Sequence, residues 1–272
     1  MKKLVIVMLL AAALGGTKGY IDHQLHQELD KLIITNQISA EYSEISSSLL
    51  GQVIITDLHL QPYVKIDKII LSKAYQFYNK LPESMVLNLK GVQIAIDNSS
   101  QSTPMLISAF GYKPYYINLK ELHNLGYSNI QTDIYLHAKL QNKKLSLSGE
   151  INANDWGKFN ISAELNNVSK LTNNMDNIEL VSFQLKYFAN ELVNKVVKHL
   201  AKRNKITPTQ LRHDFINKLK RDIKQTDITG QVQQFIENPQ VLIIDLEPNF
   251  PMNISTLQTL PLQKINLKIT NQ

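Results

Sequence analysis

Histidines and a carboxylate near the start of the chain offer the first candidate chemistry. His23 and His26 lie three residues apart in a segment with helical spacing, and Glu28 follows two residues later. Two imidazoles on one helix can hold a metal ion, but a zinc site needs three or four protein ligands. No third convergent ligand is identifiable from the sequence. We therefore interpret these side chains as surface polar residues and expect no metal and no cofactor.

The motifs that identify common enzyme classes are missing from the sequence. It contains no His-Glu-x-x-His, Gly-x-Ser-x-Gly, Gly-x-x-x-x-Gly-Lys or Gly-x-Gly-x-x-Gly. The absence of cysteine excludes disulfides, thiolate metal sites, cysteine nucleophiles and a lipid-modified cysteine. Asp and Glu residues far apart in sequence can still pair as acid and base, as they do in glycosidases. The sequence therefore favours a non-enzymatic protein, with an exported hydrolase that uses such carboxylates as the alternative.

Positive charge is concentrated in one segment of the chain. Residues 195–224 contain ten Lys and Arg and two Asp, a net charge of +8, whereas the whole chain has a net charge of +6. A basic helix face can attract anionic lipid headgroups, and each Lys or Arg near such a surface contributes about 1 kcal/mol. A merely solvated face is the simpler alternative. The candidate contacts with a membrane surface or a protein partner are Lys195, Lys198, Lys202, Arg203, Arg212, Lys220 and Arg221.

The N-terminal segment has the pattern of a bacterial export signal. Lys2 and Lys3 precede an uncharged, mostly apolar run from Leu4 to Gly16. This run is long enough for a helix of about 20 Å, which is shorter than a hydrocarbon core of about 30 Å. We expect residues 1–19 to be a signal peptide or a short membrane anchor. The rest of the chain is then periplasmic, secreted or anchored outside the cytoplasm, where it meets lipid headgroups or envelope proteins and no nucleic acid.

Alternating apolar residues predict that β-strands form much of the chain. The pattern is clearest over residues 127–165, where turns such as Asn142-Lys143 separate three alternating segments and predict an antiparallel meander. Earlier strands are predicted around a turn near Gly51 and over residues 86–96. In the latter strand the apolar positions change parity at Gly91, which indicates a β-bulge.

Helical patterns lie near the start of the chain and in its second half. Residues 21–34 have apolar residues at helical spacing, and residues 182–203 carry a longer apolar stripe. The sequence Thr207-Pro208-Thr209-Gln210 then has the pattern of a capping box, with Pro at the first helical position. These signals predict a helical hairpin whose basic residues lie opposite its apolar stripe.

Together the patterns predict an α+β fold: a mostly antiparallel, twisted β-sheet with an N-terminal helix and a C-terminal-half helical hairpin packed on it. The hydrophobic content of 43% and charged content of 19% are typical of a folded globular chain. We expect residues 20–272 to form one β-rich domain. A faint repeat, Phe77-x-Asn79-x-Leu81 and Phe188-x-Asn190-x-Leu192, leaves open two similar strand–helix halves of about 20–125 and 126–272.

Three sequence segments carry a resemblance to a known family. They are Glu41-Tyr-Ser-Glu-Ile-Ser-Ser-Ser-Leu-Leu-Gly51, Ser182-Phe-Gln-Leu-Lys-Tyr-Phe-Ala-Asn-Glu-Leu-Val193 and Glu237-Asn-Pro-Gln-Val-Leu-Ile-Ile-Asp245. In this order, after the apolar N-terminal segment, they resemble the YdgA-like family of bacterial envelope proteins. The resemblance implies an envelope location and a β-rich fold, without catalytic residues. We therefore expect a non-enzymatic exported cell-envelope protein that binds lipid or another apolar or membrane-associated ligand, or that scaffolds an envelope assembly.

Overall fold

A computed structural model describes most of the chain after the expected export segment. The described residues are 18–35, 39–48, 51–60, 64–72, 83–96, 117, 119–168, 177–222, 226–254 and 266–272. Residues 1–17 of the predicted export segment lie outside them, as does the first copy of the faint repeat at residues 77–81.

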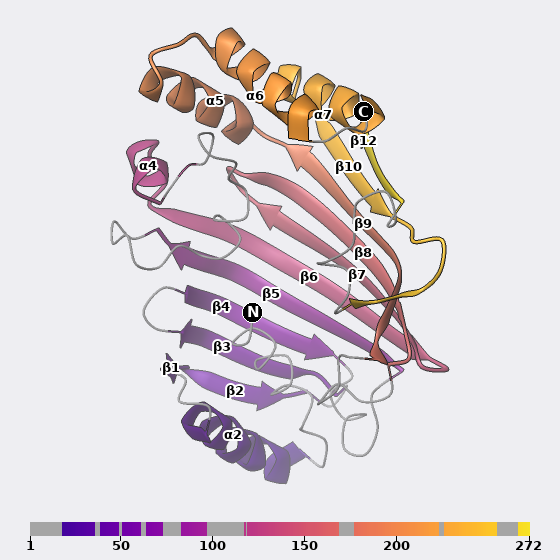
Figure 1. The fold of residues 1–272 in the computed structure, drawn as a ribbon. Helices are drawn as coiled ribbons and strands as arrows, with labels where there is room; N and C mark the ends of the chain where they lie inside the picture. The colour runs from indigo at the N-terminus through magenta and orange to yellow at the C-terminus, as the bar shows by residue number, and fades with distance from the viewer. Residues whose placement is uncertain are drawn as a thin grey trace.

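The described strands form one 12-stranded sheet in which all pairings are antiparallel (Figure 1). Its order is β1-β3-β4-β5-β6-β7-β8-β9-β10-β12, with β2 paired to β3 and β11 paired to β9. The prediction of a mostly antiparallel sheet accompanied by helices is confirmed. The strands are β1 Ala40–Glu41, β2 Glu44–Ser47, β3 Val53–Leu60, β4 Val64–Ser72, β5 Ser84–Ala95, β6 Asn129–Gln141, β7 Lys144–Ala153, β8 Gly157–Asn166, β9 Glu179–Ala189, β10 Val241–Leu246, β11 Met252–Asn253 and β12 Leu267–Asn271.

Helices lie at both ends of this sheet. They are α2 Lys18–Thr35, α4 Leu119–Asn124, α5 Leu192–Arg203, α6 Pro208–Asp222 and α7 Thr226–Glu237. Figure 1 shows α2 beside β1 and β2, and α5, α6 and α7 grouped at the opposite end near β9 and β10. Among the described residues, no helix is both long and apolar enough to cross a membrane.

The predicted meander is confirmed as β6, β7 and β8. Asn142 and Lys143 both have positive φ angles, 50° and 64°, which is the conformation of the tight turns that join antiparallel strands. The predicted bulge is also confirmed, because the β5–β6 register shifts between Leu89 and Val92, around Gly91. Gly51 has a φ of 73° and lies between the paired strands β2 and β3, as expected for the predicted turn.

One predicted helix begins too early. Residues 182–189, assigned to a helix from the sequence, belong to strand β9, and α5 starts only at Leu192. The reason is that Phe183, Leu185 and Tyr187 also alternate with polar residues, and β9 has strand partners on both sides, β8 and β10. The paired ladders satisfy the backbone polar groups of this segment, so the strand period prevails over the helical one.

The register places a row of apolar residues across nearly the whole sheet. Directly paired residues share one face of a sheet, and one such row is Val53, Leu71, Leu87, Leu136, Gly149, Ile161, Leu185, Ile244 and Ile269. We call the side that carries this row the apolar face. The neighbouring row on the other side is mostly polar: Ser72, Val86, His137, Ser148, Ser162, Gln184, Asp245 and Lys268.

Burial along the apolar face changes from one half of the sheet to the other. In β4 and β5 the residues Ile66, Leu71 and Leu87 are no more than 1% exposed, and they belong to a core that also includes Leu29 of α2. Across β7 and β8, by contrast, Ile151 and Ile161 are only half-buried. The hydrophobic core is therefore concentrated at the α2 side of the sheet, and the apolar face continues beyond it.

Candidate functional site

The half-buried part of the apolar face, along β6 to β10, is the first candidate site. Leu147 of β7 is 37% exposed on this face. Its neighbours along β6 to β10 are mostly half-buried, and none of the apolar-face positions there carries a charge. These positions are Ile130, Thr132, Ile134, Leu136, Ala138, Leu140, Leu145, Ile151, Ala153, Phe159, Ile161, Ala163, Leu165, Leu180, Phe183, Leu185, Tyr187, Leu242, Ile244 and Leu246.

Aromatic residues and α7 close one end of this surface. The Tyr187 ring stacks on Phe159 with 4.6 Å between centroids and meets Phe235 of α7 edge-on at 6.0 Å. The Tyr187 hydroxyl donates a hydrogen bond of 2.8 Å to the backbone carbonyl of Trp156. Phe235 is 7% exposed, so α7 is fixed against the strands at this end while the apolar face continues away from it.

Burial raises the pKa of the Tyr187 phenol to about 12. In the unfolded chain a tyrosine ionises near pH 10 at about its ordinary pKa, so between these values the unfolded state loses a proton that the folded state retains. The stabilisation from this group is therefore complete below about pH 10 and falls as the pH rises towards 12. Tyr187→Phe should lower stability at neutral pH by about 1 kcal/mol through the lost hydrogen bond. In urea unfolding between pH 8 and pH 11, the free energy of unfolding of Tyr187→Phe should fall less steeply with pH than that of the wild type. An equally steep fall in both proteins would contradict the raised pKa of Tyr187.

The basic residues predicted as a contact surface lie on α5 and α6, which pack together as a helical hairpin. Leu200, Ala201 and Leu211 form its buried contact. The predicted capping box starts α6, because Thr207 Oγ1 accepts a 3.2 Å hydrogen bond from Gln210 N–H and Gln210 Oε1 accepts one of 2.9 Å from Thr207 N–H. We call residues 192–222 the basic hairpin.

Three of the seven predicted contact residues make contacts within the protein. Arg203 pairs with Glu121 of α4 at 2.7 Å. Arg212 donates hydrogen bonds of 3.0 Å to the Ile236 carbonyl and to Asn194 Oδ1. Lys195 is 3.5 Å from Glu191 and lies over the Tyr127 ring at 5.6 Å. Through these three cations the basic hairpin contacts α4, α7 and Tyr127, which lies just before β6.

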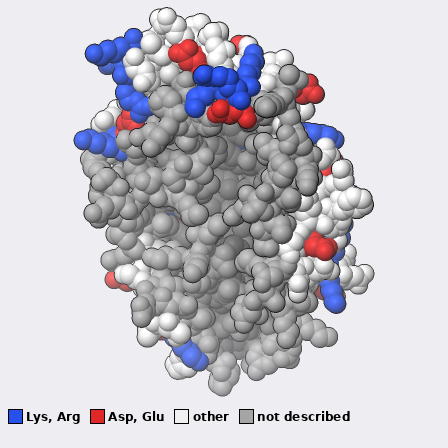
Figure 2. Space-filling model, in the orientation of Figure 1, with Lys and Arg blue, Asp and Glu red and all other residues white. Residues whose placement is uncertain are grey.

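The other four predicted residues, Lys198, Lys202, Lys220 and Arg221, are exposed. Arg221 Nε lies 3.4 Å from the Asn217 carbonyl of its own helix. Figure 2 shows Lys and Arg side chains gathered at the end of the molecule formed by α5, α6 and α7. These four residues, two on α5 and two in the last turn of α6, are the exposed members of the predicted set.

Three of the carboxylates that the structure describes, Glu121, Glu150 and Glu164, pair with cations. Glu150 lies 2.7 Å from Lys158, and Glu164 lies 2.6 Å from Lys144. Glu121 contacts His199 at 3.3 Å in addition to Arg203. These contacts join neighbouring strands or helices, which is the geometry of structural ion pairs.

His23 and His26, considered as metal ligands from the sequence, make hydrogen bonds near α2. His26 Nδ1 lies 3.0 Å from the Tyr42 hydroxyl, which itself donates to Asp30 at 2.9 Å. His23 Nε2 lies 3.1 Å from Gln27 Nε2. In the part of the chain that the structure describes, no three His, Asp or Glu residues are grouped so that they could hold a metal ion.

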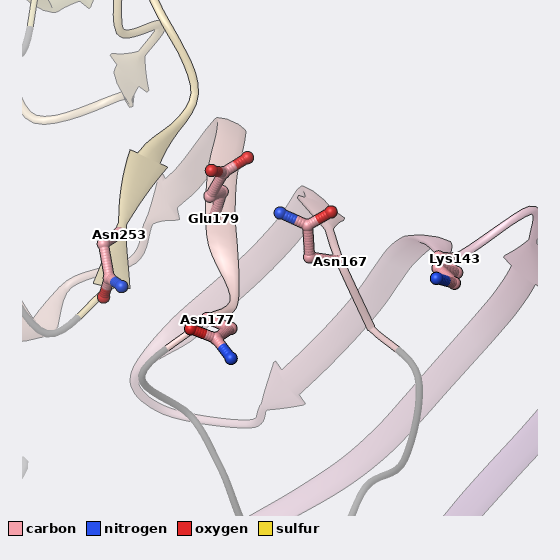
Figure 3. Close-up of a pocket in the computed structure, with 5 residues that line it drawn as sticks. All are labelled: Lys143, Asn167, Asn177, Glu179 and Asn253. Atoms are coloured by element: carbon pink, nitrogen blue, oxygen red, sulfur yellow. The ribbon is translucent and has the colours of Figure 1, made fainter.

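A polar pocket lies at the end of β8 and the start of β9 (Figure 3). Its volume is about 400 Å³, and its described lining is Lys143, Asn167, Asn177, Glu179 and Asn253. All five side chains are polar, in contrast to the apolar face. Sequence analysis did not identify this pocket, because its residues come from the β6–β7 turn, from the two ends of the β8–β9 connection and from β11.

The continuity of the apolar face was also missed. Apolar and polar residues alternate in the sequence of each strand. Which apolar residues lie side by side, however, depends on the register between strands, and no local sequence pattern gives that register. Following which positions are apolar through the turns at Gly51 and Asn142-Lys143 and through the bulge at Gly91 would have indicated that the apolar positions share one side.

Fold and site together define an open antiparallel sheet with one partly covered apolar face, a basic helical end and a small polar pocket. A family model described as "Uncharacterized protein" matches residues 150–272, from within β7 to the end of the chain. A search of the curated proteins finds no match.

Proposed function

We propose that this chain is a non-enzymatic, exported protein of the cell envelope that binds a lipid acyl chain on the half-buried part of its apolar face, along β6 to β10. The observation that carries the proposal is the change in burial along one face. The same apolar row is fully buried at Leu71 and Leu87 but half-buried at Ile161 and Leu185. An extended apolar surface that the described part of the chain buries only partly is typical of a binding site.

The size and chemistry of this surface fit an acyl chain. The strands β6 to β10 span roughly 20 Å at about 4.8 Å between neighbours, and half of a bilayer core, one acyl-chain length, is about 15 Å. Apart from the Thr132 and Tyr187 hydroxyls, which already donate hydrogen bonds to backbone carbonyls, the described residues of this surface are aliphatic or aromatic and uncharged, so they offer mainly dispersion contacts. An aliphatic chain is therefore the occupant that the surface favours.

The basic hairpin supplies a means of contact with an anionic membrane surface. If Lys198 and Lys202 lie near lipid headgroups, each contributes about 1 kcal/mol, so replacing both with Gln should weaken binding to anionic vesicles by roughly thirtyfold. Added salt should weaken wild-type binding. The matched control is Lys90→Gln with Lys139→Gln, which removes the same charge from exposed positions on the sheet. Co-sedimentation with phosphatidylglycerol vesicles measures both, and equal losses in the two double variants would leave the hairpin as a solvated surface.

Acyl-chain binding is tested with two neighbouring substitutions on opposite faces of β7. Leu147→Asp introduces a charge on the apolar face, whereas Ser148→Asp introduces the same charge on the polar face. Because an acyl chain would desolvate the new carboxylate, Leu147→Asp should reduce affinity for a fluorescent palmitate analogue by at least about tenfold. Ser148→Asp should bind like wild type. No binding of the analogue by the wild-type protein, or equal losses in the two variants, would refute the proposal.

A further inference from the structure

The polar pocket has walls that are fixed by backbone hydrogen bonds. Val168 N–H donates to the Lys143 carbonyl at 2.9 Å, and Val168 itself is 2% exposed. On the other side, β11 pairs with β9 so that Asn253 is directly opposite Glu179, and Ile254 N–H donates to the Ile178 carbonyl at 3.1 Å. The lining side chains therefore project from a backbone held in place on both sides of the pocket.

Two lining residues adopt backbone conformations that are uncommon for side chains with a Cβ atom. Lys143 and Asn167 both have φ angles of 64°, in the left-handed region. Figure 3 shows Asn167 between Glu179 and Lys143. The amide of Asn167 is thus placed between the positive and the negative end of the pocket lining.

The charged residues of the pocket differ from those nearby on β7 and β8, which form ion pairs. Lys144, next to Lys143, pairs with Glu164 at 2.6 Å, and Lys158 pairs with Glu150 at 2.7 Å. Among the residues that the structure describes, neither Lys143 nor Glu179 makes such an ion pair. One cation and one anion therefore line the same small pocket without neutralising each other.

We propose that this pocket binds a small zwitterion, with its anionic group at Lys143, its ammonium group at Glu179 and its remaining polar atoms at the three asparagines. Amide side chains both donate and accept hydrogen bonds, so Asn167, Asn177 and Asn253 can serve either end of such a ligand. The described lining has no aromatic ring on which a sugar would stack. A free amino acid and an ethanolamine phosphate headgroup share the required chemistry. This site is separate from the apolar face and does not depend on the proposed acyl-chain function.

Calorimetric titration of the full-length protein tests the proposal with single small molecules. The probes are L-alanine and O-phosphoethanolamine as zwitterions, propionate and propylamine as singly charged compounds, and glucose as a neutral one. At least one zwitterion should bind, and each singly charged compound should bind at least about tenfold more weakly, since it loses one charge contact. Preference for L-alanine would indicate a free amino acid, and preference for O-phosphoethanolamine would indicate a lipid headgroup.

Two variants and one control complete the test. Lys143→Gln and Glu179→Gln should each reduce zwitterion affinity by about tenfold or more, while Lys139→Gln, on β6 outside the pocket, should bind like wild type. Thermal unfolding of all three variants checks that the fold is retained. The proposal would be overturned by glucose binding as tightly as the zwitterions, by no binding of either zwitterion, or by equal affinities in the folded variants and wild type.

Discussion

Replacing Leu71 with alanine is expected to lower the free energy of unfolding by about 2–5 kcal/mol, the range for large-to-small changes in a closed core. Leu71 is 0% exposed at the centre of the packed half of the sheet. Leu147→Ala, the same change on the same apolar face, should cost only about 1 kcal/mol because Leu147 is 37% exposed and leaves no closed cavity. Urea unfolding of both variants measures the difference. Similar losses would mean that the apolar face is covered equally along its length.

The second large effect is expected at the β7–β8 turn. Gly157 has a φ of 109°, and a Cβ atom there would lie 2.3 Å from the Phe188 carbonyl oxygen and 2.8 Å from the Tyr187 ring. Gly157→Ala must therefore accept an unfavourable dihedral angle and also displace strand β9 from the turn. We expect the free energy of unfolding to fall by about 3–5 kcal/mol, the sum of the costs of backbone strain and overpacking.

Gly126→Ala is the matched control for this substitution. Gly126 has a φ of 92°, but nothing lies within 4 Å of the position that its Cβ would occupy. The free energy of unfolding of Gly126→Ala should therefore fall only by the cost of backbone strain, about 1–3 kcal/mol. Urea unfolding of the two variants measures the difference between their free energies of unfolding, which is due to the steric contact with β9. If the two values were equal, the turn could move away from Tyr187 and Phe188 at little cost.

The strands that could be predicted from the sequence are those whose neighbours follow immediately in the chain. In β6, β7 and β8 the alternation and the turn residues lie in one continuous segment, so local patterns contain the required information. In β9 they do not, because Leu185 fits both a helical stripe with Leu192 and a strand alternation with Phe183 and Tyr187. The decision between them depends on pairing with β10, which starts more than fifty residues later.

The candidate sites show the same limit. The excess of Lys and Arg in residues 195–224 is visible in the sequence, but the partner of Arg203 is Glu121, 82 residues away. Which cations are engaged and which remain available therefore depends on tertiary contacts. The polar pocket was not predictable at all, since Lys143 and Asn253 are separated by most of the second half of the chain and have no spacing that signals a site.

The strand order of the sheet has a consequence for how the chain can fold. From β3 to β10 each strand pairs with the next one in sequence, so every new strand adds to an edge that has already formed. Most pairings then close short loops, which keeps the entropy cost of each step small and favours fast folding for a large β-protein. A chain that is synthesised from its N-terminus can build its sheet progressively from the packed side around Leu71. The half-buried part of the apolar face would be assembled last, just before α7 packs against β12.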